Sequence, residues 1–149
     1  MSVRRARAAD LDALVPLFDG YRVFYGQPSD PAGARAFLAE RFERDESVIF
    51  MAEDTAGGAP VGFTQLYPSF TSAGMQRIYI LNDLFVAEGA RRQGIGTALL
   101  GAAADFARDQ GAARLALSTA FDNLAARSVY EAHGWTRDEV FYNYTFRLG

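Results

Sequence analysis

The segment Arg91-Arg-Gln-Gly-Ile-Gly-Thr97 constrains this chain more than any other part of the sequence. It follows an apolar strand pattern over residues 78–86 and opens a helical pattern from Ile95 to Gln110. Glycines between a strand and a helix let the backbone approach a ligand, so that N–H groups and the positive end of the helix dipole face an anion. We therefore expect a phosphate or pyrophosphate here, although the same glycines also suit a tight turn without a ligand. The candidate ligand-binding residues are Arg91, Arg92, Gln93, Gly94, Ile95, Gly96 and Thr97.

Two familiar phosphate-binding motifs do not fit this segment. A P-loop needs Lys-Ser or Lys-Thr after its glycines, and the chain contains no lysine. The dinucleotide fingerprint needs a third glycine, where this chain has Leu99. The turn therefore belongs to another class of anion-binding site.

A second motif follows about thirty residues later. Gly111 is well placed to end the first helix, and residues 114–119 form a short strand pattern. A further helix is expected from a cap at Asp122 or Asn123 to a stop at Gly134. Asn123 and Tyr130 are seven residues apart, so they lie on one face of that helix. An amide and a phenol so placed can address two points of one extended ligand.

The two motifs together resemble the GCN5-related N-acetyltransferase (GNAT) family. In that family an Arg/Gln-x-x-Gly-x-Gly/Ala turn binds the pyrophosphate of acetyl-CoA, and an Asn-x-x-Ala-x-x-x-Tyr-x-x-x-Gly-Phe segment follows. The second motif reads Asn123-Leu-Ala-Ala-Arg-Ser-Val-Tyr130-Glu-Ala-His-Gly-Trp135 in this chain, with Trp135 for the usual Phe. The resemblance covers residues 78–146 well, and the first half by the order of its elements.

The resemblance implies roles for the strand that precedes the turn and for the second motif. Backbone groups of Leu84, Phe85 and Val86 would pair with the pantetheine arm of acetyl-CoA, and one N–H there would polarise the thioester oxygen. Asn123 would hydrogen-bond the pantetheine, and Tyr130 would be the general acid that protonates the leaving thiolate. Each residue also has a structural alternative to these roles: Asn123 could serve only as a helix cap, and Tyr130 could be a side chain of the core.

Asp83 is the candidate general base and a candidate substrate-binding residue, acting on the amine through water. Polyamine acetyltransferases have a Glu-Asp pair at this place in the strand, and this chain has Asn82 where they have the Glu. The difference weakens the argument for Asp83 as the base and the argument for a polyamine as the substrate. The alternative is a structural aspartate beside a strand bulge, and Glu53 is a weaker candidate base. The aromatic side chains expected to line the acceptor pocket, or else to pack in the core, are Tyr21, Phe24 and Tyr25.

Length and composition restrict the function classes. A chain of 149 residues suits one domain over 1–149, and half of its residues are hydrophobic. A net charge of −3 argues against nucleic-acid binding. The absence of cysteine excludes a thiolate metal site and an acyl-cysteine intermediate. The N-terminus lacks the apolar core of a signal peptide and no run reaches membrane-spanning length, so we expect a cytoplasmic protein without a metal site or a membrane partner.

The order of elements predicts an α/β (α+β) fold: a mixed, mostly antiparallel sheet of six to seven strands, flanked by about four helices. The resemblance adds splayed central strands. The expected strands are 3–8, 47–53, 61–67, 76–86, 114–119 and 141–147, with a hairpin turn at 54–58 and a loop at 68–74. The expected helices are 11–25, 31–44, 95–110 and the helix that begins after Asn123.

These observations predict an acetyl-CoA-dependent N-acetyltransferase that acts on a primary amine of a small molecule or peptide by direct attack in a ternary complex. A non-catalytic CoA-binding sensor and a protein N-terminal or lysine acetyltransferase are the alternatives. A loop at 68–74 would be the lid over a small acceptor. The aromatic, alternating final strand 141–147 predicts a homodimer.

Overall fold

The computed structural model describes residues 1–55 and 58–149, and the chain divides into two compact units, Met1–Leu117 and Ser118–Gly149. Each unit is described by itself. The predicted hairpin turn at 54–58 includes residues 56 and 57, which lie outside the described residues. No helix in the described residues is both long enough and apolar enough to cross a membrane.

The first unit contains a sheet, three α-helices and two short 3-10 helices. Its strands are β1 (Ser2–Arg5), β2 (Val48–Glu53), β3 (Pro60–Thr71), β4 (Gln76–Val86) and β5 (Leu115–Ala116). Its helices are η1 (Ala8–Asp10), α1 (Leu11–Phe24), α2 (Pro31–Glu43), η2 (Glu88–Ala90) and α3 (Ile95–Asp109). At the start of α2, the Asp30 side chain accepts a hydrogen bond from the Gly33 N–H and Pro31 takes the first helical position, as predicted.

The five strands lie in the order β1-β2-β3-β4-β5. The first three pairings are antiparallel and β4–β5 is parallel, so the sheet is mixed and mostly antiparallel, as predicted. The predicted loop at 68–74 is wrong for residues 68–71, because β3 continues to Thr71 and only residues 72–75 form the turn into β4 at Gln76. Pro68 is tolerated because β2 no longer pairs with β3 beyond Leu66, so the missing N–H breaks no ladder on that side. The prediction that this loop covers a small acceptor as a lid is therefore not supported.

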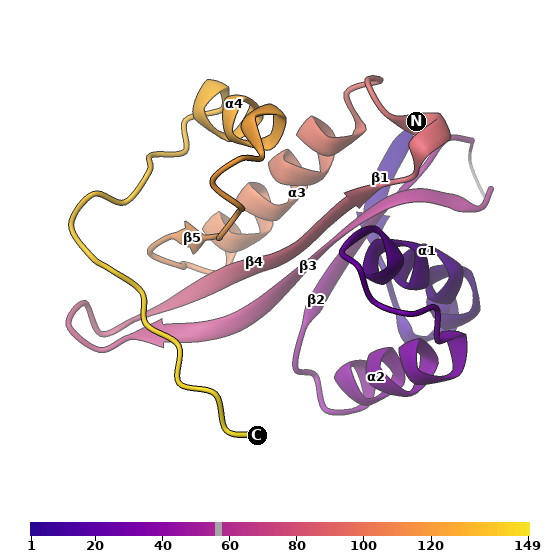
Figure 1. Cartoon of the computed structure of the whole chain (residues 1–149), viewed down its shortest axis with the longest axis horizontal. Helices are drawn as coiled ribbons and strands as arrows, with labels where there is room; N and C mark the ends of the chain where they lie inside the picture. Colours follow the sequence, from indigo (N-terminus) through magenta and orange to yellow (C-terminus); the bar gives the residue numbers. More distant parts are fainter. Residues whose placement is uncertain (56–57) are drawn as a thin grey trace. The chain divides into compact units, whose positions relative to one another are not determined.

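Alternation along the strands directs apolar side chains to both faces of the sheet, and each face is covered by helices of this unit (Figure 1). Helices α1 and α2 pack on one face, where Leu14 and Leu38 meet Ile49, Met51 and Phe63. Helix α3 packs on the other face, through a cluster of Ala52, Ala90, Ile95 and Leu99. The α1 face carries the polar and aromatic site described below.

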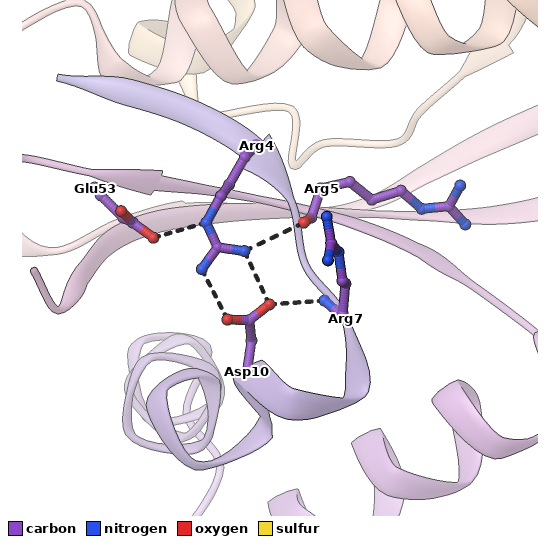
Figure 2. A network of polar contacts seen from close by, with 5 residues as sticks. All are labelled: Arg4, Arg5, Arg7, Asp10 and Glu53. Atoms are coloured by element: carbon purple, nitrogen blue, oxygen red, sulfur yellow. Dashed lines mark hydrogen bonds and ion pairs between the residues drawn. The ribbon is translucent and has the colours of Figure 1, made fainter. Parts of the chain in front are cut away.

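A polar network connects β1, β2 and the start of the first helical segment (Figure 2). Arg4 donates to the Glu53 carboxylate at 2.9 Å and to both oxygens of Asp10 at 2.8 and 3.0 Å. Hydrogen bonding to Arg4 lowers the pKa of Asp10. Glu53, the weaker candidate base, is thus the partner of an arginine on the edge strand of the sheet, which favours a structural role.

The second unit contains one helix, α4 (Leu124–Ala132). The Asn123 side chain caps it by accepting a hydrogen bond from the Ala126 N–H at 3.2 Å, and Gly134 follows the helix with φ of 88°, both as predicted. The predicted strand at 141–147 is not confirmed, because these residues enter no ladder in the described part of the chain. The sheet therefore has five strands instead of six to seven.

Candidate functional site

A bulge in β4 directs the candidate base into the protein. Gln65 pairs with Asp83 and Leu66 pairs with Leu81, so Asn82 is the extra residue on β4. Asn82 is exposed, whereas Asp83 is 3% exposed. The bulge predicted at these two residues is confirmed, and it gives a physical reason for a carboxylate in the middle of an apolar strand.

Polar side chains surround the Asp83 carboxylate. Gln65 Nε2 donates to Oδ2 at 2.5 Å, and Asn82 Nδ2 donates to Oδ1 at 2.9 Å. The Tyr21 hydroxyl lies beside them and donates to the Asn82 carbonyl at 3.5 Å. Burial raises the pKa of Asp83, and the hydrogen bonds from Gln65, Asn82 and Tyr21 oppose that rise. A carboxyl with a raised pKa is better matched to proton transfer near neutral pH than an exposed one.

Two residues of β3 belong to this cluster and were not predicted from the sequence. Gln65 is 0% exposed, and its Oε1 has no hydrogen-bond partner among the described residues. Tyr67 is half-buried, and burial together with the charge of Asp83 raises its pKa to about 12. The sequence does contain a signal for Gln65, because the polar pair Thr64-Gln65 interrupts an apolar strand just as Asn82-Asp83 does. A polar pair on each of two neighbouring strands indicates a buried polar site.

Of the predicted aromatic residues at the end of α1, Tyr21 lies next to the carboxylate. Tyr21 contacts the Phe85 ring of β4 with centroids 6.0 Å apart, and it contacts Tyr25 at 5.0 Å. Phe24 also contacts Phe85 at 6.0 Å. Phe24 and Tyr25 are 58% and 57% exposed, whereas Tyr21 is half-buried. The three rings form one aromatic cluster that begins with Tyr21 beside Asp83 and reaches the surface at Phe24 and Tyr25, and their role toward an acceptor stays a prediction.

The end of β4 has one edge available for a ligand. Pairing between β4 and β5 is limited to Tyr79 with Leu115 and Ile80 with Ala116, whereas β4 continues to Val86. Leu84, Phe85 and Val86 pair with β3 on the other side and are half-buried. Within the described residues, no strand pairs with the second edge of residues 81–86. The splayed central strands that the resemblance implies stay a prediction.

The glycine turn follows β4 after one intervening turn, η2, instead of following it directly. The backbone is left-handed at Arg92, with φ of 65°, and at Gly94, with φ of 77°. Gly94 is the N-cap of α3, and no side chain in the described part of the chain caps that end. A Cβ on Gly94 would meet no described heavy atom within 4 Å. Packing around its Cβ therefore does not demand this glycine, and a helix start without a side-chain cap suits an anion.

The two arginines of the turn differ in their contacts. Arg91 Nε donates to the Val86 carbonyl at 2.9 Å, and its guanidinium stacks over the rings of Phe24 at 5.0 Å and Phe85 at 5.7 Å. Arg91 thereby links the turn to the aromatic cluster. Arg92 and Gln93 are exposed. The role of each of these residues toward a phosphate stays a prediction.

The remaining predicted residues lie on α4, in the second unit. Asn123 uses its Oδ1 as the helix cap, which leaves its amide NH₂ as the group that would donate to a ligand. The Tyr130 ring lies 6.0 Å from Trp135, centroid to centroid, and is half-buried. Sequence reasoning placed both residues on one helix, and their roles toward a thioester stay predictions.

Comparison with known proteins identifies the family. The model of the "Acetyltransferase (GNAT) family" matches residues 14–135, which include the bulge, the glycine turn and α4. This chain belongs to the GNAT family. GNAT acetyltransferases generally use acetyl-CoA, so the family fits both the turn and the free edge of β4.

Similar proteins carry acetyltransferase names. The chain is 51% identical over 148 residues to an uncharacterized N-acetyltransferase, YhfO, of Bacillus subtilis (strain 168), with 99% of this chain and 98% of the relative covered. It is 30% identical to an aminoglycoside N(6')-acetyltransferase type 1 of Serratia marcescens, over 80% of this chain and 83% of the relative. A crystal structure of a probable acetyltransferase matches with a TM-score of 0.95 at 45% identity, over 100% of this chain and 99% of the other.

Proposed function

We propose that residues 1–149 form one acetyl-CoA-dependent N-acetyltransferase domain, which transfers an acetyl group to a primary amine of a small molecule or peptide by direct attack. One observation carries the proposal. In the described residues, the N-terminus of α3 has no side-chain cap and begins at the left-handed Gly94, and it follows a strand that pairs on only one side from residue 81 to 86. Such a pair of features offers N–H donors for a diphosphate and a strand edge for an amide-containing arm.

On the donor side, the residues present fit acetyl-CoA. The backbone N–H groups of 94–97 would hold the diphosphate, and the exposed Arg92 guanidinium would add a charge-assisted hydrogen bond. The backbone of Leu84 to Val86 would pair with the pantetheine arm, and the Asn123 amide would hydrogen-bond it. Acetyl-CoA itself supplies the acetyl thioester.

On the acceptor side, the buried carboxyl and the aromatic rings of α1 favour a cationic amine. An ammonium ion interacts well with the faces of Tyr and Phe rings. Burial raises the pKa of Asp83, so its carboxylate would be an adequate base for removing a proton from that ammonium through water. The Serratia marcescens relative is named for an aminoglycoside, which supports a small-molecule amine as the acceptor.

The transfer needs one further proton, on the sulfur. A bond forms between the amine nitrogen and the acetyl carbon, the C–S bond breaks, and the departing sulfur must be protonated. Tyr130 is the proposed donor, since a phenol O–H can act as a general acid toward a departing thiolate.

The test is a thiol-release assay with acetyl-CoA across aminoglycosides, polyamines, amino acids and peptides, with product masses measured. The proposal predicts amine-dependent release of CoA and an acetylated amine product for at least one class of acceptor. Binding of acetyl-CoA without transfer to any acceptor would instead support the sensor. Acetylation confined to peptides and proteins would support the protein acetyltransferase.

A further inference from the structure

The side chain of Gln65 is fully buried, and only one end of its amide has a described partner. Gln65 is 0% exposed. Its Nε2 donates to Asp83 Oδ2, whereas its Oε1 forms no hydrogen bond with any described residue. Buried carbonyl groups are nearly always hydrogen-bonded, so one without a partner, on a residue that touches the candidate base, requires an explanation.

The two ends of a glutamine amide have nearly the same shape and opposite hydrogen-bonding character. The nitrogen carries two donors, the oxygen is an acceptor, and the last torsion of the side chain has a roughly two-fold preference. Turning the amide of Gln65 over would therefore exchange its two ends without extra space. Since no described donor holds Oε1 in place, the orientation is decided by the group that faces the other end, which is the Asp83 carboxyl.

Asp83 presents a different partner to this amide in each of its two proton states. As a carboxylate it only accepts hydrogen bonds, and as an acid it has one O–H to donate. The 2.5 Å between Gln65 Nε2 and Asp83 Oδ2 is shorter than the usual N–H···O distance of about 2.7–3.2 Å and within the range of about 2.5–3.0 Å for O–H···O. The same separation therefore also suits an acid O–H that points at an amide oxygen. Burial raises the pKa of Asp83 and so brings the acid form closer to neutral pH.

The other titratable groups that face Asp83 in the described residues are phenols. Tyr21 of α1 and Tyr67 of β3 both lie within reach of the Asp83 charge. Burial raises the pKa of Tyr67 to about 12 and also raises the pKa of Tyr21, while Arg41 of α2 opposes the rise at Tyr67. Both hydroxyls therefore stay protonated near neutral pH, and Asp83 is the member of this cluster that gains or loses a proton.

We propose that Gln65 is a positioning residue for Asp83 that pairs with both of its proton states. Its Nε2 donates to the carboxylate, and after the amide turns over, its Oε1 accepts the O–H of the acid. The inference rests on the proposed function in that it takes Asp83 as the base. In that role an N–H bond of the substrate ammonium breaks, the proton passes through water, and an O–H bond forms on Asp83. The turned amide then holds the protonated carboxyl in the same place.

NMR of the full-length chain, labelled with ¹³C and ¹⁵N, tests the exchange directly. The Asp83 Cγ signal reports the proton on the carboxyl, and the Gln65 Nε2–H signals report the hydrogen bond of the amide. Signals that disappear in Asp83→Asn and in Gln65→Leu assign the two groups. As the pH falls, we expect the hydrogen-bonded Nε2–H signal to move upfield with the same midpoint as Asp83 Cγ. Constant Nε2–H signals while Asp83 titrates, or an Asp83 that does not titrate while the protein is folded, would overturn the inference.

Two neighbouring substitutions on β3 separate positioning from packing. Gln65→Leu removes both ends of the amide at similar volume. Thr64→Val, at an equally buried residue, removes the hydrogen bond that Thr64 Oγ1 donates to the Asp83 backbone carbonyl at 2.8 Å and leaves the carboxyl contacts in place. Because a hydrogen bond to a charged group is stronger than one between neutral groups, Gln65→Leu should raise the proton affinity of Asp83 about tenfold. Thr64→Val should leave the midpoint of the Asp83 Cγ titration in place, and equal shifts in both variants would also overturn the inference.

The NMR measurements need neither acetyl-CoA nor an amine acceptor, so they are independent of the assay for acetyl transfer. Transfer to an amine by a protein whose Gln65 signals stay constant would leave the proposed function standing and reject this inference. An amide that follows the proton of Asp83 without any acetylated amine would support the pairing and reject the proposed function. When an acceptor is found, the acidic limb of the kcat/KM profile against pH should move in Gln65→Leu by the same amount as the NMR midpoint.

Discussion

The glycine turn allows a sharp test, since α3 has a left-handed glycine at each end. Gly94 precedes the helix with φ of 77°, and Gly111 follows it with φ of 71°. At both positions an added methyl group would meet no described heavy atom within 4 Å. Gly94→Ala and Gly111→Ala therefore impose the same kind of backbone strain without a steric clash, and only the first lies where the diphosphate is proposed to bind.

The expected magnitudes separate strain from binding. A left-handed alanine costs about 1–2 kcal/mol, so both variants should lose about that much free energy of unfolding. For a chain of this size, each kcal/mol corresponds to a fall of about 2–4 °C in the melting temperature. At Gly94 the methyl group would also stand between the backbone and the diphosphate. The loss of about one charge-assisted hydrogen bond, worth roughly 1.5–3 kcal/mol, would raise the Kd for CoA about 10- to 150-fold.

Isothermal titration with CoA measures the Kd of both variants, at a temperature where thermal denaturation shows them folded. We expect equal losses of stability in the two variants, with a CoA Kd within about twofold of the unmodified protein for Gly111→Ala. Unchanged CoA binding by Gly94→Ala would refute the reasoning. An equal rise in the CoA Kd of both variants would also refute the reasoning, because the loss of binding would then come from reduced stability of α3.

Three further perturbations test other parts of the account. Because burial raises the folded-state pKa of Asp83, the stability that its neutral carboxyl confers is complete below about pH 4 and is lost as the pH rises through the raised value. Urea unfolding should therefore show unmodified protein losing stability relative to Asp83→Asn as the pH rises from about 4, and parallel profiles would contradict this. Tyr130→Phe should lower kcat about 100-fold or more with the Kd for acetyl-CoA nearly unchanged, and steady-state kinetics showing an undiminished rate would return Tyr130 to a packing role. Arg4→Ala leaves the buried Glu53 carboxylate without its arginine and should cost about 1–3 kcal/mol by denaturant unfolding. Arg35→Ala, which breaks an exposed ion pair, should cost less than about 1 kcal/mol, and equal losses would argue against the network.

Sequence alone predicted the elements whose causes are local. Helices α1, α2, α3 and α4 were found from period and caps, because Asp30-Pro31, Gly111 and Asn123 act within one turn of the chain. The bulge was also predictable, since Asn82-Asp83 interrupts an apolar strand. The family was recognisable for the same reason, because its motifs are short and continuous.

Features that depend on distant pairing were predicted less well. Pro68 and the residues after it were assigned to a loop, whereas pairing with β4 holds them in a strand. Residues 141–147 alternate as a strand does, but they enter no ladder in the described part of the chain, because pairing depends on distant residues that a local pattern does not specify. Gln65 was missed because its contact with Asp83 joins residues eighteen positions apart.

A crystal structure of the protein with CoA tests the central claim most directly. The account predicts diphosphate oxygens within about 2.7–3.2 Å of backbone nitrogens among residues 94–97, at the start of α3. A diphosphate bound elsewhere, with those nitrogens in contact only with water or with the protein's own side chains, would contradict the account.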